Sequence, residues 1–185
     1  MTETLIQPYD PAWPAWFEQI RTVLQAALAD TYLTIEHVGS TAVPGLSAKP
    51  IIDLDIVIAP VQFATIKDRL ARLGYQHEGD LGIIGREAFN LPPHHRLKTT
   101  LPAHHLYVCP QDSPELKRHL YFRERMKAVE AERRYYDHKK RQIAALCDHD
   151  KKLYAQVKGL VLHQFFTQIL AELEPAPEIK RTDRD

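Results

Sequence analysis

The hydrophobic residues of this chain recur first at a helical period and then in short apolar runs. After Pro11, large apolar side chains follow at helical spacing over 13–28, which predicts an amphipathic helix. Two runs rich in β-branched residues come next, at 33–38 (LTIEHV) and 51–58 (IIDLDIVI), and predict strands. The segment between them, 39–50, is rich in turn residues, and we expect one short helical piece there.

The middle of the chain alternates between helix and strand signals. Residues 61–74 are typical of a helix that ends at a glycine. We expect two short strands in a hairpin-like arrangement at 75–79 and 82–91, followed by a loop at 92–102. The apolar run 103–109 (AHHLYVC) then predicts a further strand, closed by a proline.

From Ser113 onward the pattern is helical and highly charged. Ser113 followed by proline and glutamate is typical of a helix N-cap, and we expect helix to about residue 170 with a break near 147–150. The proline-rich, charged tail 173–185 is expected to be flexible. Helices and strands in this order predict an α+β fold, with a mixed β-sheet packed with helices over 1–112 and a helical C-terminal half over 113–172. Together they form one predicted domain, 1–172.

Composition and charge narrow the class of protein. The 185 residues are 44% hydrophobic and 26% charged, which suits a globular domain with its own core. Lysine plus arginine and aspartate plus glutamate number 24 each, so no general nucleic-acid binding is expected. Residues 1–112 hold 8 basic and 12 acidic residues, whereas 113–165 hold 13 and 7. The two parts could frame a site for a metal-bound anion, although solvated helix faces would give the same pattern.

The cysteines and the lengths of the apolar runs indicate where in the cell the protein is expected. Cys109 and Cys147 are far apart and lie outside any C-x-x-C motif, so neither a disulfide framework nor a thiolate zinc site is expected. The chain shows no signal-peptide pattern at its start, and no apolar run approaches the length of a membrane span. We therefore expect a cytoplasmic protein that does not enter the membrane.

Two carboxylates stand one residue apart in the strand predicted at 51–58. Side chains alternate between the faces of a strand, so Asp53 and Asp55 share one face while Ile52, Leu54 and Ile56 point into the core. Two neighbouring carboxylates repel each other unless a cation lies between them, and oxygen ligands suit Mg²⁺ or Mn²⁺. The pattern favours a metal site; an exposed strand face is the alternative.

A glycine-serine turn precedes this strand. Gly39 allows close approach of a ligand to the backbone, and backbone N–H groups in a turn can hold phosphate oxygens. Ser40 and Thr41 add hydroxyl donors. A phosphate site just before a metal-binding strand is the layout of phosphoryl or nucleotidyl transfer.

These residues resemble a known family. The segment VGSTAVPGLSAKPIIDLDIVI resembles the signature of the GrpB family, and PYDPAWPAWF, HHLYV, LYFRERMKA and KGLVL fit as well, so the resemblance covers about residues 5 to 170. It implies a nucleotidyltransferase-like fold of the polymerase-β superfamily, with a Gly-Ser turn, an acidic-x-acidic strand and a third acidic residue on a later strand. Gly39, Ser40, Asp53 and Asp55 match the first two elements.

The third element departs from the superfamily pattern. The later strand carries no carboxylate, and GrpB-like sequences usually show His-x-His there. His105 matches this pattern, whereas Tyr107 does not and is a poor ligand for Mg²⁺. This difference puts a standard two-metal mechanism in doubt. A similar domain is found fused to dephospho-coenzyme A kinases, which hints at an accessory role.

Basic residues at family positions complete the candidate site. Lys49 precedes the acidic strand and could neutralise a phosphate or pair with one of the aspartates. Arg86, Arg123 and Lys158 fall where the family carries basic residues, and Lys140 fits a similar position. For the basic residues on predicted helices, Arg123, Lys140 and Lys158, a solvent-exposed surface position is the alternative. His37, before the turn, is either a wall of the site or a packed core histidine.

The resulting hypothesis is a nucleotidyltransferase-like protein that binds a nucleoside triphosphate with Mg²⁺ or Mn²⁺ and transfers a nucleotidyl group to an unknown acceptor. Asp53 and Asp55 would hold the metal and act in catalysis with His105. Two alternatives stay open: a non-catalytic nucleotide- or phosphate-binding accessory domain, and a different small-molecule enzyme that uses His105 and Tyr107. A small-molecule nucleotide is the expected partner, with a protein partner or a homo-oligomer also possible.

Overall fold

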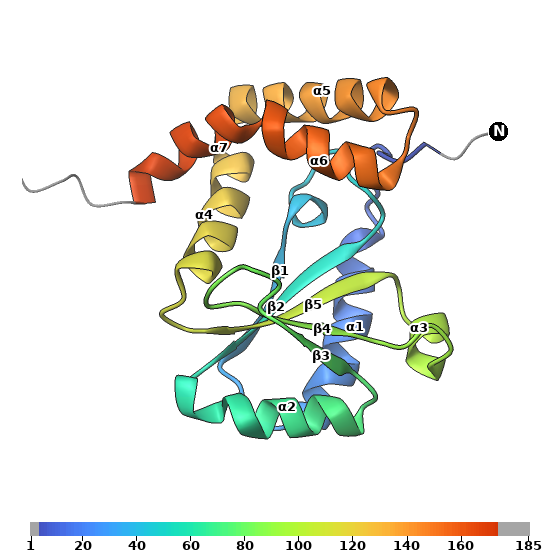
Figure 1. Cartoon of the computed structure of the whole chain (residues 1–185), viewed down its shortest axis with the longest axis vertical. Coiled ribbons are helices and arrows are strands. Elements are labelled where there is room, and N and C mark those ends of the chain that lie inside the picture. Colours follow the sequence, from blue (N-terminus) through green and yellow to red (C-terminus); the bar gives the residue numbers. More distant parts are fainter. Residues whose placement is uncertain (1–3, 174–185) are drawn as a thin grey trace, which may run out of the picture.

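The computed structural model describes residues 4–173, and it confirms the α+β fold (Figure 1). The strands are β1 (Thr34–Val38), β2 (Ile52–Ile58), β3 (Gln76–Gly79), β4 (Glu87–Asn90) and β5 (His104–Pro110). The α-helices are α1 (Trp13–Leu28), α2 (Phe63–Arg72), α3 (Arg96–Thr100), α4 (Pro114–Ala128), α5 (Glu130–Leu146), α6 (Lys151–Val161) and α7 (His163–Leu170). Short 3₁₀ turns are η1 (Ser40–Ala42), η2 (Pro60–Gln62) and η3 (Ala171–Leu173).

The five strands form one mixed sheet in the order β1-β2-β5-β4-β3. β2 and β5 pair in parallel at its centre, and the other neighbouring pairs are antiparallel. β5 follows β2 only after α2 and the β3–β4 hairpin, which supply the long crossover that a parallel pair requires. The register sets Asp53 opposite His105 and Asp55 opposite Tyr107.

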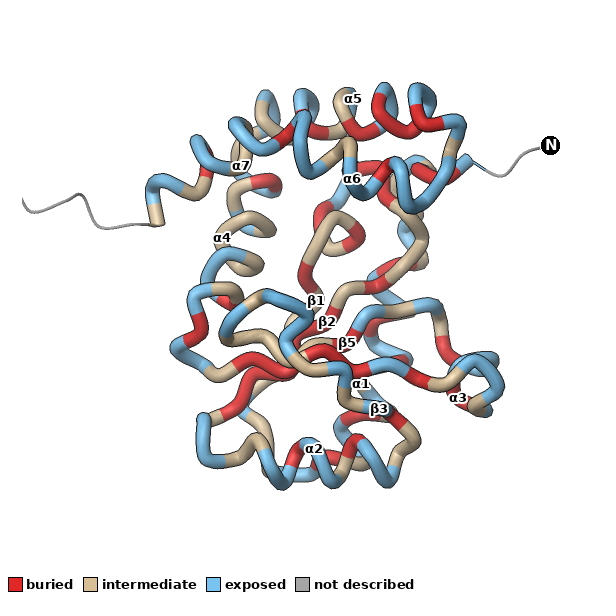
Figure 2. The backbone as a smooth tube through the Cα atoms, in the orientation of Figure 1, coloured by how far each residue is buried: buried red, intermediate tan, exposed pale blue. Residues whose placement is uncertain are grey.

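One face of the sheet packs into the main hydrophobic core. Ile52, Leu54 and Ile56 of β2 are fully buried there with residues of α1 and α2, as the alternation along the strand predicted. Figure 2 shows buried backbone along the central strands and exposed outer faces on α2 and α5. The acidic face of β2 lies on the opposite side, where α4 contacts β1 and β5.

A second core joins the helical half to the chain segment that follows β1. Its buried residues come from both parts of the chain: Leu5, Ile6, Val43, Leu46, Met126, Tyr136, Ile143, Ala144, Cys147, Tyr154, Leu162 and Ile169. In Figure 1, α5, α6 and α7 lie at the opposite end of the molecule from α2. The segment after Gly39 is therefore held by the helical half as well as by the sheet.

Several predicted boundaries agree with the structure. Gly74 follows α2 with φ +100°, the left-handed conformation of a helix stop. The Ser113 hydroxyl accepts a hydrogen bond from the Leu116 N–H at 3.3 Å, which makes it the predicted N-cap of α4. The break at 147–150 is also present, and Asp150 caps α6.

Other boundaries were wrong. The strand predicted at 82–91 is confined to β4, because Gly82 and Gly85 adopt positive φ in turns. The loop predicted at 92–102 contains α3. The helical half also breaks at Val129 and Leu162, where neither glycine nor proline marks the sequence. The predicted tail from residue 174 lies outside the described residues. Across residues 4–173, the helices fall short of the length or the apolar character that spanning a bilayer demands.

Candidate functional site

The Gly39–Ser40 turn lies against the acidic end of β2. β1 runs antiparallel to β2 with Val38 opposite Asp53, so the turn that follows β1 is adjacent to Asp53. Gly39 has φ +72° and ψ −167°, a conformation that is essentially restricted to glycine. A Cβ atom at this position would overlap Asp53 Oδ2 and lie 3.1 Å from Asp53 Cγ. Gly39 is thus required by the backbone and by Asp53 before any ligand is considered.

Asp53 is hydrogen-bonded to the histidine beside it on β5. Its Oδ1 lies 2.8 Å from His105 Nδ1, and the side chains are 31% and 54% exposed. This contact follows from the register, because paired residues of neighbouring strands project from the same face. The sequence-predicted catalytic residues Asp53 and His105 are therefore together, and open to solvent.

Asp55 is completely buried and is paired with His119 of α4. Its Oδ2 lies 2.7 Å from His119 Nδ1, and His119 Nε2 lies 3.2 Å from Glu115 Oε1. Burial raises the pKa of Asp55, against the effect of its hydrogen bond from His119. Burial lowers the pKa of His119, but the hydrogen bonds to Asp55 and Glu115 outweigh burial and raise that pKa to about 10. At neutral pH His119 is an imidazolium between two carboxylates.

The two histidines change the expectation of simple repulsion between the aspartates. Each aspartate has a histidine within hydrogen-bond distance, so part of the charge is compensated without a metal. Asp55 Oδ1 is buried and nevertheless has no hydrogen-bond partner among the residues that the structure describes. A buried, unpartnered carboxylate oxygen is costly unless a ligand or ion satisfies it.

A third carboxylate does lie on this face of the sheet, but on the opposite neighbour of β2. Glu36 of β1 stands opposite Asp55, and its Oε2 lies 2.9 Å from Arg123 Nη1. On β5 the corresponding position is Tyr107, whose pKa burial raises to about 12. The Arg86 guanidinium lies 4.2 Å from the centre of the Tyr107 ring. The sequence signal for the third carboxylate was Glu36 itself, a single carboxylate within the strand predicted at 33–38.

Lys140 of α5 reaches the glycine-serine turn from the helical half. It is 2% exposed, its Nζ lies 3.1 Å from Ser40 Oγ, and it donates a further hydrogen bond to the Ser47 carbonyl. The Tyr136 ring centre is 4.5 Å from Nζ. No carboxylate within residues 4–173 forms an ion pair with it. Burial, followed by the charge of Lys158, lowers the pKa of Lys140 to about 7.

Two adjoining cavities open between the sheet and the helical half. The first measures about 290 Å³. The second, on the α4 side, measures about 390 Å³. Both are lined by Ser40, Asp53, Tyr136 and Lys158, so they meet at the turn and the acidic strand. Together they form one cleft, whose first cavity also contains Thr41, Lys49, His105, Lys140 and Tyr154.

The remaining predicted residues are divided between the cleft and the scaffold. Lys49 Nζ lies over the Tyr154 ring at 4.7 Å, without an ion pair to either aspartate. Arg123 donates to Glu36 and, at 2.8 Å, to the His37 carbonyl, so its contacts hold α4 on β1. Neither Arg86 nor Arg123 lines the two cavities.

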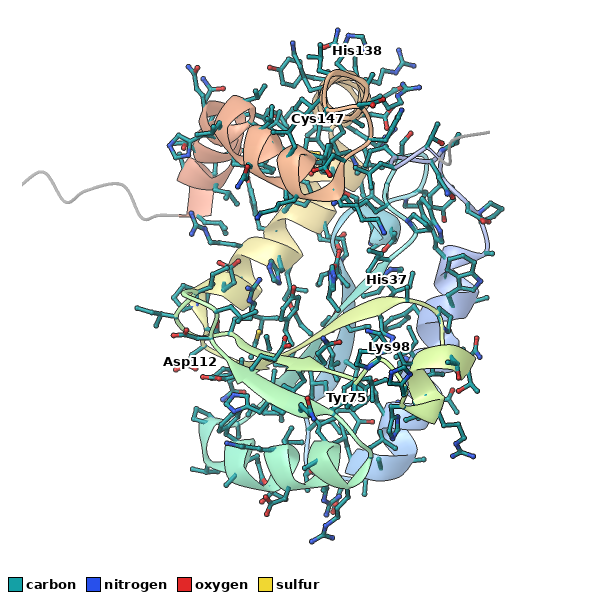
Figure 3. The ribbon with its side chains drawn as sticks, turned by 45° about the vertical axis from the view of Figure 1, so that its right-hand side comes forward. His37, Tyr75, Lys98, Asp112, His138 and Cys147 are labelled. Atoms are coloured by element: carbon teal, nitrogen blue, oxygen red, sulfur yellow. The ribbon has the colours of Figure 1, made fainter. Side chains whose placement is uncertain are left out.

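His37 is a packed residue. Its ring stacks on Phe17 at 4.8 Å between centroids, and its Nε2 lies 3.0 Å from Thr41 Oγ1. Burial lowers its pKa to about 4, against the opposing charge of Asp53, so the ring is neutral at pH 7. Figure 3 shows His37 within the molecule and His138 at its outer end on α5. His104 faces away from His105 and contacts the Tyr75 hydroxyl at 2.7 Å, as expected for adjacent residues of a strand.

The donor set fits a divalent cation only if a ligand completes its coordination. Asp53 and Asp55 provide carboxylate oxygens; Asp53 lines both cavities, whereas Asp55, whose Oδ1 has no partner among the described residues, is completely buried and lines neither. Within residues 4–173, no three side chains of the His, Cys, Asp and Glu type are grouped to bind a metal by themselves. Mg²⁺ is commonly held by one or two carboxylates together with substrate phosphates, and that arrangement is compatible with this site.

Comparison with known structures bears first on the fold. The fold is nucleotidyltransferase-like: 76% of this chain superposes on 43% of the structure of Cid1 in complex with its short product ApU, with a TM-score of 0.52 and 10% identity, a likeness of fold alone. The family can be assigned more narrowly than the fold, because the sequence model of the family described as GrpB protein matches residues 3–171. The chain belongs to the GrpB family, as the resemblance in the sequence indicated.

Individual relatives support this assignment. The crystal structure of the conserved protein GrpB from Enterococcus faecalis has a TM-score of 0.74 and 28% identity, covering 91% of this chain and 98% of that one. A UPF0157 protein of Pseudomonas aeruginosa is 34% identical over 90% of this chain and 67% of its own length. The chain spans only 42% of a UPF0157 protein of Bacillus subtilis, to which it is 28% identical over 82% of its own length.

Proposed function

We propose that the cleft binds a nucleoside triphosphate together with Mg²⁺ or Mn²⁺ and that the protein transfers the nucleotidyl group to an acceptor. The observation that carries this proposal is Lys140, a buried lysine without a carboxylate partner in the described chain that touches the glycine-serine turn. Burial of an unpaired ammonium is unfavourable, so a site that retains one is suited to bind an anion.

The side chains around Lys140 indicate which kind of anion would bind there. Ser40 offers a hydroxyl donor, and Lys49 and Lys158 add two further cations around the first cavity, whereas the buried Thr41 hydroxyl donates to the Ile51 carbonyl. Several cations in a small polar cavity match a polyphosphate better than a single carboxylate. The Tyr136 ring lies against the Lys140 ammonium and the Tyr154 ring lies against that of Lys49. A planar group of the ligand could pack on these rings as well.

The acidic face would complete the reaction centre. Asp53 and Asp55 would hold the cation, which when bound neutralises phosphate charge and polarises the phosphorus–oxygen bonds. His105 lines the same cavity and is held by Asp53, so it is placed to accept a proton from an acceptor hydroxyl. Lys140, Lys158 and the turn would stabilise the departing pyrophosphate.

A second candidate is a nucleotide- or phosphate-binding domain without turnover. Tyr107 in place of a third acidic residue on β5, and the engagement of Glu36 by Arg123, favour this candidate. Both candidates require binding in the cleft, and they differ only in the formation of product.

Calorimetry with the four common nucleoside triphosphates, with and without Mg²⁺ or Mn²⁺, tests the proposal. We expect binding that depends on the metal and that is lost when Asp53→Asn and Asp55→Asn are combined. Pyrophosphate release on addition of a cell-extract small-molecule fraction would distinguish the transferase from the binding domain. If no triphosphate binds with either metal, the transferase is excluded, and of the second candidate only a domain that binds phosphate without a nucleoside remains.

A further inference from the structure

We propose that a cavity beside the cleft, over β4 and β5, is the subsite for the acceptor and takes a small polyhydroxyl compound such as a sugar or a cyclitol. This inference rests on the proposed nucleotidyl transfer and names the class of its acceptor. The cavity, called here the acceptor cavity, measures about 390 Å³ and shares Ile51 and His105 with the first cavity of the cleft. Its polar lining also includes Glu78, Asn90, Lys98 and Tyr107.

The order of the strands places the acceptor cavity on the far side of Asp53 from the glycine-serine turn. The turn follows β1, on one side of β2, whereas His105 lies on β5, on the other side. In phosphoryl transfer the attacking and departing oxygens lie roughly in line, with the phosphorus between them. If pyrophosphate departs toward Ser40 and Lys140, the acceptor has to approach from the β5 side, where the acceptor cavity lies.

The acceptor cavity opens on the acidic face of the sheet. Tyr107 of β5 stands opposite Asp55 on β2 and opposite Ala88 on β4, and paired residues project from the same face. Asn90 follows Ala88 by two residues in β4 and therefore shares that face. Tyr107, Ala88 and Asn90 all line the acceptor cavity. A compound bound there lies over the same face as the candidate metal ligands.

Three polar side chains form a row along the wall of the acceptor cavity. Lys98 of α3, labelled in Figure 3, donates a hydrogen bond from its Nζ to Asn90 Oδ1 at 3.0 Å. Asn90 Nδ2 in turn lies 3.5 Å from Glu78 Oε1 on β3. All three residues are exposed. A hydroxyl group both donates and accepts, so a ligand with several adjacent hydroxyls matches a row of ammonium, amide and carboxylate.

The charges of the acceptor cavity differ from those of the first cavity. The Lys98 ammonium and the Glu78 carboxylate are of opposite sign and compensate each other. The first cavity instead contains Lys49, Lys140 and Lys158. A polyphosphate is therefore attracted to the first cavity, and an uncharged hydroxyl compound suits the acceptor cavity.

The two cavities together would accommodate both reactants of the transfer. A hydroxyl oxygen of the acceptor would form a bond to the α-phosphorus of the triphosphate. The bond from that phosphorus to the bridging oxygen of pyrophosphate would break, and the hydroxyl proton would be released to solvent. The step needs no oxidant, reductant or further reactant.

The single asparagine of the chain provides a reporter inside the acceptor cavity. Labelling with ¹⁵N-asparagine yields side-chain amide signals from Asn90 alone. The labelled protein is titrated with glucose, ribose, myo-inositol, glycerol and the diamine putrescine, each with and without Mg²⁺ and a non-hydrolysable triphosphate. Glu78→Ala tests the wall of the cavity. Glu130→Ala is the matched control, because Glu130 is exposed, pairs with Arg134 on α5 and lines none of these cavities.

We expect at least one of the polyols to shift the Asn90 amide signals in a saturable way, both with and without the triphosphate. Glu78→Ala should weaken this binding on the order of tenfold, because a charged hydrogen-bond acceptor is lost, whereas Glu130→Ala should bind as the wild type does. The absence of any shift with the polyols, a shift with putrescine alone, or competition between polyol and triphosphate would each overturn the proposal. Equal affinity in the two alanine variants would overturn it as well.

The same titrations separate this inference from the proposed function. If triphosphate binds in calorimetry but no polyol shifts the Asn90 signals, the triphosphate site stands and only the acceptor cavity is wrongly assigned. If a polyol binds and no triphosphate does, the cavity is a polyol site, and its role as acceptor subsite fails together with the proposed transfer.

Discussion

Replacing Lys140 by methionine should stabilise the protein while it destroys the binding of polyphosphate. Methionine has a similar length and no charge, so the substitution tests the buried ammonium with little change in packing. The wild-type Lys140 side chain is almost completely buried, and within residues 4–173 its Nζ forms hydrogen bonds only to Ser40 Oγ and the Ser47 carbonyl. A group retained for ligand binding at a cost in stability is expected to behave in this way.

The magnitude follows from the pKa. The ordinary lysine pKa of 10.5 is lowered to about 7, first by burial and then by Lys158. At about 1.4 kcal/mol for each tenfold change in proton affinity, this difference amounts to about 5 kcal/mol against the charged form. The two lost hydrogen bonds offset about 1 kcal/mol each. The Lys140→Met variant should therefore be more stable at pH 7 by about 2 to 3 kcal/mol.

The lowered pKa of Lys140 also determines how the free energy of unfolding changes with pH. Between about pH 7 and 10.5 the unfolded chain retains a proton on Lys140 that the folded chain has released, so this lysine makes wild-type stability rise with pH. The advantage of Lys140→Met should shrink by about 2 kcal/mol between pH 7 and pH 9. Urea unfolding at several pH values, without phosphate in the buffer, measures both quantities. A variant that is less stable than the wild type at pH 7, or a difference independent of pH, would show that the buried ammonium of Lys140 does not destabilise the folded protein.

Three further substitutions test neighbouring parts of the site. Asp55→Asn should lower the free energy of unfolding by about 3 kcal/mol in urea denaturation, because it breaks a buried ion pair with His119; an unchanged midpoint would show that the pair contributes nothing. Gly39→Ala should cost about 1 to 3 kcal/mol in the same assay, since the residue has φ +72° and faces Asp53; wild-type stability would contradict the backbone described for the turn. Ser40→Ala should weaken triphosphate binding by about 1 to 2 kcal/mol in calorimetry, with full-strength binding as the contrary result.

Local patterns predicted the parts of the site that depend on a few consecutive residues. The alternation of side chains along β2 was sufficient to place Asp53 and Asp55 on one face and Ile52, Leu54 and Ile56 on the other. The glycine-serine turn followed from residue type. The structure shows a second reason why this position is a glycine: a side chain there would overlap Asp53 even without a ligand. A side chain at Gly39 should therefore reduce stability as well as obstruct a ligand.

The contacts made by the helical half could not be predicted in the same way. His119 is 64 residues from Asp55, and Lys140 is 100 residues from Ser40. Both stand on highly charged helices, where a single histidine or lysine has no distinguishing pattern. Their burial depends on how α4 and α5 fold back over the sheet, and the break at Val129 that permits this carries no glycine or proline.

The position of a bound Mn²⁺–triphosphate complex shows whether Asp53 and Asp55 hold the cation in the cleft. Paramagnetic broadening of the histidine ring signals in NMR spectra reports which histidines lie close to Mn²⁺, and His138 on the outside of α5 is the internal control. With triphosphate present, we expect strong broadening of the His105 and His119 signals, none for His138, and loss of the effect when Asp53→Asn and Asp55→Asn are combined. Broadening of His138 alone, or equal broadening in the double variant, would contradict it.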